Sequence, residues 1–196
     1  MKKTSALRQV IRIVALLNLA YFAVEFTVAT TIGSVSLFAD SIDFLEDASI
    51  NLLIFMALRW SAHRRALVGK CLAFILFVPA LATLWMVWKK FTMPVAPSPV
   101  LLSLVGSGAF IVNFSCALML ARYRHHDSSL MRAAFLSARN DVLANIAIVF
   151  AGLVTAYLWP TAWPDIIVGL GIAAMTADAA HEIWTAATKE RLAAKP

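Results

Sequence analysis

Long apolar runs limit how this chain can fold more than any other feature. Each run has about 20 residues or more, the length that a helix needs to cross a bilayer, whereas a barrel strand needs about 10. Inside lipid the backbone must satisfy its own polar groups, so a helical bundle is the class that remains. The six runs, with approximate limits, are Leu7–Ile32, Val35–Leu58, Leu67–Trp88, Val100–Leu120, Met131–Leu158 and Trp163–Ala187.

The composition favours the same class. Of the 196 residues, 61% are hydrophobic and only 14% are charged, whereas about a quarter are charged in an ordinary soluble protein. We predict an all-α integral membrane bundle of six transmembrane helices over residues 1–188. Residues 189–196 form a short cytoplasmic tail that is too small for a folded domain.

The basic residues gather on one side of this predicted bundle, and only Lys89 and Lys90 fall on the other side. By the positive-inside rule, both termini and the second and fourth loops are cytoplasmic. Topology thus explains the net charge of +6 without a nucleic-acid partner, and we expect a multi-pass protein of the bacterial inner membrane. The basic residues on the cytoplasmic side are Lys2, Lys3, Arg8, Arg12, Arg59, Arg64, Arg65, Lys70, Arg122, Arg124, Arg132, Lys189, Arg191 and Lys195.

Several ionisable residues interrupt the apolar runs. A charged group in a bilayer costs several kcal/mol, so each is a functional candidate by default. They are concentrated in the first, second, fifth and sixth segments, which we expect to line a polar pathway. The residues are Glu25, Asp40, Asp43, Glu46, Asp47, Arg139, Asp141, Asp178 and Glu182.

The second segment carries the densest acidic pattern. At about 100° per residue, Asp40, Asp43, Asp47 and Asn51 fall within a stripe of roughly 80°, while Glu46 points about 100° away from Asp47. The i, i+4 spacing of Asp43 and Asp47 puts two oxygen ligands one turn apart, which suits a divalent cation bound from one side. Without a cation, two such carboxylates repel each other and one takes up a proton. The pair is therefore predicted to exchange metal for protons.

The fifth segment supplies a second half-site. Ser137, Asp141 and Asn145 recur every four residues on one face, with Asn140 at its flank and Arg139 nearly opposite. Asp141 is the third predicted ligand, and Ser137 and Asn140 are candidates to complete the site. At about 1.5 Å per residue, Asp141 lies roughly 15 Å from the cytoplasmic end of its helix, close to the depth of Asp47.

These residues resemble the cation diffusion facilitator family over essentially the whole chain. The resemblance implies a six-helix exporter, usually a homodimer, that moves divalent metal out of the cytoplasm in exchange for protons. Carried over residue by residue, Asp43, Asp47 and Asp141 match the ligands of the family's transport site. The segments that carry the resemblance are Ser34-Val35-Ser36-Leu37-Phe38-Ala39-Asp40-Ser41 before Asp43-x-x-x-Asp47, Glu25, Asp141 with Asn145, and Trp163-Pro164-Asp165.

The chain departs from the family pattern in two places. Zinc-transporting members have His four residues before the Asp of the fifth helix, where this chain has Ser137. An all-oxygen site is harder than one with imidazole, which favours manganese or ferrous iron over zinc and leaves zinc, cobalt and cadmium as further candidates. The cytoplasmic metal-binding domain that follows the sixth helix in many members is missing, so dimerisation and metal sensing through that domain are not implied.

Other roles remain open for several of these acids. Glu46 points away from the acidic stripe, and an ion pair of Arg139 with Glu46 or Asp178 is favoured over metal ligation. Glu25 and Asp40 belong either to a proton path or vestibule, or to local hydrogen bonding.

Two other functional classes are alternatives to transport. The chain has no nucleophile–base spacing and no HExxH motif, so we do not expect an enzyme. No cofactor is expected beyond the transported metal. The alternative is a non-transporting membrane metal receptor or scaffold with the same fold.

Overall fold

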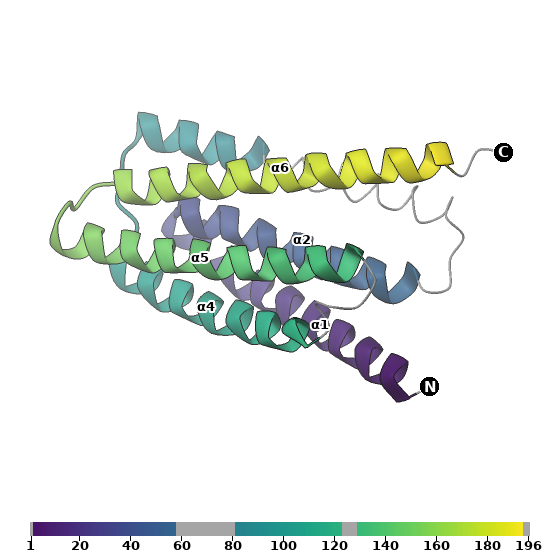
Figure 1. Ribbon diagram of the computed structural model, residues 1–196. Coiled ribbons are helices and arrows are strands. Elements are labelled where there is room, and N and C mark those ends of the chain that lie inside the picture. Colours follow the sequence, from purple (N-terminus) through teal and green to yellow (C-terminus); the bar gives the residue numbers. More distant parts are fainter. Residues whose placement is uncertain (1, 58–80, 123–128, 194–196) are drawn as a thin grey trace.

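The computed structural model is helical throughout its regular structure and describes residues 2–57, 81–122 and 129–193. The helices lie side by side with their axes roughly aligned (Figure 1). They are α1 (Lys2–Ile32), α2 (Val35–Ala57), α4 (Pro99–Ala121), α5 (Ser129–Tyr157) and α6 (Trp163–Ala193), and residues 81–92 are also helical.

The predicted apolar segments coincide with these helices. The α1 helix starts earlier than the segment, at Lys2, and α6 continues to Ala193, because each helix extends into polar turns beyond its apolar stretch. The first part of the third predicted segment, residues 67–80, lies outside the described residues. Gly33 has a φ of 64° and turns the chain between α1 and α2, a conformation that glycine adopts without strain.

The helices form a membrane bundle. Among the described residues, three stretches are long and apolar enough to cross a bilayer: Ala6–Ile32, Pro99–Ala121 and Ala138–Tyr157. Many large apolar side chains of these helices face outward, such as Leu104, Ile111 and Phe150. In a membrane these side chains contact lipid.

The α2 helix is central, because it contacts α1, α4, α5 and α6. Every residue from 35 to 42 on it is buried. The carboxylates of α2 are therefore placed in the interior of the bundle.

The two ends of the bundle differ. The start of α1 and the end of α6 lie at one end, which we call the termini end (Figure 1). The turn at Gly33, residues 93–98 and the α5–α6 connection lie at the other, which we call the turn end.

Candidate metal site

The first two predicted ligands lie on α2. Asp47 is buried, and its Oδ2 accepts a hydrogen bond from Nδ2 of Asn18 on α1 at 3.4 Å. Nδ2 of Asn51 donates to the backbone oxygen of Asp47 at 2.8 Å, which keeps the amide beside the acid. Asp43 is partly buried, and its Oδ1 accepts a hydrogen bond from the hydroxyl of Thr176 on α6. Both carboxylates are thus oriented by neutral donors from neighbouring helices.

The third predicted ligand, Asp141, approaches from α5. Its side chain is buried, and α5 packs against α2. The structure thus brings the three predicted carboxylates toward one region between α2 and α5. Among the residues that the structure describes, no three His, Cys, Asp or Glu side chains are arranged to hold one metal ion.

The other candidates for the site lie on α5. The side chain of Ser137 is outside the described residues, although its backbone is part of α5. Asn140 is partly buried, and its Oδ1 accepts a hydrogen bond from Nη2 of Arg139 at 3.4 Å.

The predicted ion pair of Arg139 with Glu46 or Asp178 is wrong. Arg139 and Asp178 are both exposed, Glu46 is buried, and no salt bridge joins Arg139 to either acid, all three being described residues. The physical reason is rotation about the axis of α5. Arg139 is roughly 160° around the helix from Asp141, so it shares the acid's depth but not its direction.

Glu25 and Asp40 form a second acidic pair. Glu25 is 0% exposed, and Asp40 exerts the strongest acidic charge effect on it. Oδ2 of Asp40 accepts a hydrogen bond from Nδ2 of Asn145 at 2.6 Å, and Oδ1 of Asn145 accepts one from Asn113 at 3.0 Å. No donor group reaches the buried oxygens of Glu25 or Oδ1 of Asp40, although the two carboxyl groups lie within hydrogen-bonding reach of each other. Both alternatives for this pair, a proton path or vestibule and local hydrogen bonding, therefore stay open.

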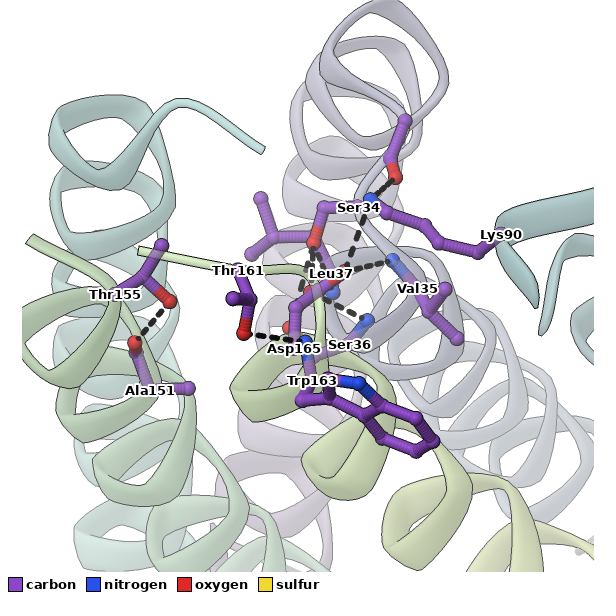
Figure 2. Close-up of polar contacts among 11 residues, drawn as sticks. Ser34, Val35, Ser36, Leu37, Lys90, Ala151, Thr155, Thr161, Trp163 and Asp165 are labelled. Atoms are coloured by element: carbon purple, nitrogen blue, oxygen red, sulfur yellow. Dashed lines mark hydrogen bonds and ion pairs between the residues drawn. The ribbon is translucent and has the colours of Figure 1, made fainter. Parts of the chain in front are cut away.

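A third polar group lies at the turn end, which we call the outer network (Figure 2). Asp165 of α6 accepts hydrogen bonds on Oδ1 from the hydroxyls of Ser34 and Ser36, both at 2.7 Å, and from the Ser36 N–H at 3.1 Å. Its Oδ2 accepts the Val35 N–H at 2.9 Å and an ion pair from Lys90 at 3.3 Å. The carboxylate therefore caps the first turn of α2, where the helix dipole favours negative charge.

Close backbone contact makes this cap possible. A Cβ atom at Gly169 would lie 2.7 Å from Cγ1 of Val35 and 2.8 Å from the nitrogen of Ser36. Only glycine lets α6 approach the start of α2 so closely. From the sequence, Lys90 counts only as a charge that indicates topology. The sequence does not single out Asn18, Asn113 or Thr176 as site residues, because an uncharged polar side chain in one helix shows no pattern that predicts its partner in another.

Comparison with known proteins gives one family. The model of the cation efflux transmembrane domain matches residues 11–189. The match therefore includes α2, α5 and α6, which carry the acidic groups described above. No curated protein matches the chain.

Proposed function

The chain belongs to the cation efflux family, and from this premise we propose that it exports a divalent metal cation through a transport site formed by Asp43, Asp47 and Asp141. The observation that supports the site is the burial of acidic groups from α2 and α5 in one region of a membrane bundle. Keeping several carboxylates ionised there is costly unless cations or protons neutralise them. The buried Lys90 does not serve this purpose, because it pairs with Asp165 at the turn end.

We propose a topology of six spans with both termini in the cytoplasm. The start of α1 and the end of α6 lie at the same end of the bundle, as an even number of spans requires. The turn end then faces outward, away from the basic loops. A homodimer in the bacterial inner membrane belongs to the same proposal and rests on the family resemblance.

We propose that the site is completed by oxygen, from Ser137, Asn140 or water. Three carboxylates with hydroxyl or amide oxygen form a hard ligand set, which favours manganese or ferrous iron over zinc. Cobalt and cadmium remain substrates to test beside these three.

Export is proposed to be coupled to protons. The proposed ligand set contains no histidine, so any exchanged proton binds a carboxylate oxygen, and metal and proton compete for it. An inward proton gradient would then drive the metal outward. Glu25 and Asp40 line the path between the transport site and the turn end, and alternating access is supplied by rocking of the acidic helices.

Flux measurements test the proposal. The purified protein is reconstituted into vesicles with a clamped membrane potential, and uptake of Mn²⁺, Fe²⁺, Zn²⁺, Co²⁺ and Cd²⁺ is followed with and without a pH gradient. We expect uptake that the gradient accelerates, that Asp47→Ala abolishes, and that Asp178→Ala, an exposed acid on α6, leaves unchanged. Flux that ignores the gradient would exclude antiport. Metal binding without flux would establish the receptor alternative.

A further inference from the structure

The α1 and α2 helices pack as an antiparallel hairpin whose side chains meet in successive pairs. Asn18 meets Asp47 through the hydrogen bond of 3.4 Å. One turn toward the turn end, the rings of Tyr21 and Phe44 pack with their centroids 5.0 Å apart. The hydroxyl of Tyr21 donates to the backbone oxygen of Val105 on α4 at 2.6 Å, so this aromatic pair is fixed to a third helix.

Glu25 and Asp40 are the next polar pair in the same register. Each lies seven residues from the Asn18–Asp47 pair, which is about two helical turns or roughly 10 Å nearer to the turn end. The aromatic pair lies between the Asn18–Asp47 pair and the Glu25–Asp40 pair, and Asp43 lies next to Phe44, about one turn from Asp40. The hairpin therefore contains two acidic levels in series along α2.

At the outer level, no donor group of the described residues reaches either oxygen of Glu25 or Oδ1 of Asp40, and the two carboxyl groups lie within hydrogen-bonding reach of each other. The nearby donors are directed elsewhere. The Tyr21 hydroxyl bonds to Val105, and the Asn145 amide bonds to the other oxygen of Asp40. Buried polar groups are nearly always paired, so oxygens left open in this way indicate a ligand.

We propose that Glu25 and Asp40 form a second cation-binding site, the outer station, which holds the divalent cation between the transport site and release. The proposal rests on the proposed export function. Two carboxylates match the charge of a divalent ion, and their open oxygens are the ligands that hard cations prefer, with water completing the coordination. Asp43 lies between Asp47 and Asp40 on α2, so the cation moves outward from the transport site to the outer station in successive steps along one helix.

The number of bound ions tests this inference. The chain is reconstituted in nanodiscs, and bound Mn²⁺ and Zn²⁺ are each counted by equilibrium dialysis. We expect Glu25→Gln to lose one ion per chain compared with the wild type. The triple variant Asp43→Asn/Asp47→Asn/Asp141→Asn should keep one ion, and adding Glu25→Gln to it should remove that ion.

Glu46→Gln is the matched control, because Glu46 is another buried glutamate but lies off the acidic stripe, and it should leave the count unchanged. An unchanged ion count in Glu25→Gln would overturn the outer station, and so would a change only in the protons released on metal binding, since the pair would then hold a proton. A triple variant that loses no ion while Glu25→Gln loses one would instead refute the transport site and leave the outer station standing. If the triple variant does not fold, Glu25→Gln in the wild-type background decides alone.

Discussion

Asp165 and Glu25 are both 0% exposed carboxylates in the same bundle, yet their surroundings are opposite. Asp165 receives hydrogen bonds from two hydroxyls and two backbone N–H groups, and an ion pair from Lys90. No donor group reaches either oxygen of Glu25, whose carboxyl lies beside that of another acid, Asp40. Burial alone therefore does not distinguish a structural acid from a functional one.

The difference in pairing suggests a difference in role. The outer network saturates its carboxylate and ties α6 and the 81–92 helix to the first turn of α2. Deeper in α2, Asp47 accepts a hydrogen bond from the amide of Asn18, and Asp43 accepts one from the hydroxyl of Thr176. A cation that binds there gains from their charge, whereas a cation at Asp165 would compete with an ammonium group already in place.

The largest expected effect comes from neutralising the transport site. Asp43→Asn, Asp47→Asn and Asp141→Asn should each reduce metal flux to the level of protein-free vesicles, because each removes a charged ligand. Each protein should still fold, since the substitution also removes repulsion between buried acids. Vesicle flux and size-exclusion profiles measure the two properties together. Normal transport in any two of the three variants would contradict the assignment.

The second effect should be on stability instead of transport. Asp165→Asn leaves the ammonium of Lys90 buried without its counter-charge, which typically costs about 3 to 5 kcal/mol. We expect a clear shift of the unfolding midpoint in an SDS titration followed by circular dichroism. Asp178→Asn, an exposed acid on the same helix, is the control. An unchanged midpoint for Asp165→Asn would show that the outer network does not stabilise the bundle.

A third, smaller effect concerns selectivity at the transport site. Ser137→His places an imidazole one helical turn before Asp141, the spacing at which both side chains reach one ion. We expect the ratio of zinc to manganese flux to rise about tenfold, equivalent to about 1.4 kcal/mol. Competition between the two metals in one vesicle preparation measures the ratio, with Ser137→Ala as the control. An unchanged ratio would place this position away from the metal.

The sequence was sufficient to predict the helices and the acidic stripe, because both depend on periodicity within one segment. Length and apolar content located the helix that begins at Val35, and the 100° rotation per residue grouped Asp43 with Asp47. The sequence did not predict which residues meet across helices, such as Thr176 and Asp43, because those contacts depend on the register between helices that are distant in the chain. The ion pair expected for Arg139 is wrong because Arg139 faces outward and Glu46 faces inward, and periodicity within one helix does not show which way that helix is turned toward its neighbours.

The same limit applied to the outer network. In the sequence, the Trp163-Pro164-Asp165 segment is notable only for its family resemblance. Its carboxylate caps α2 because the fold brings the starts of α2 and α6 together, which the sequence does not show. Nothing in the sequence indicates that Lys90, one of two neighbouring basic residues at the turn end, has a buried partner.

The smallest expected effect is within the outer network, and it tests whether the hydrogen bonds to Asp165 still stabilise the bundle after one donor is removed. Ser34 donates to Asp165 at 2.7 Å and its Oγ accepts the N–H of Leu37 at 3.1 Å, as a residue that caps a helix does (Figure 2). Ser34→Ala removes these two bonds and the 3.3 Å hydrogen bond between the Ser34 and Ser36 hydroxyls, but it leaves the carboxylate with the Ser36 and Val35 donors and with its ion pair. We therefore expect a loss of only about 1 kcal/mol in the SDS titration, with metal flux unchanged. A loss as large as that of Asp165→Asn would mean that the network fails as a unit when one donor is removed, and reduced flux with normal stability would mean that the turn end takes part in transport.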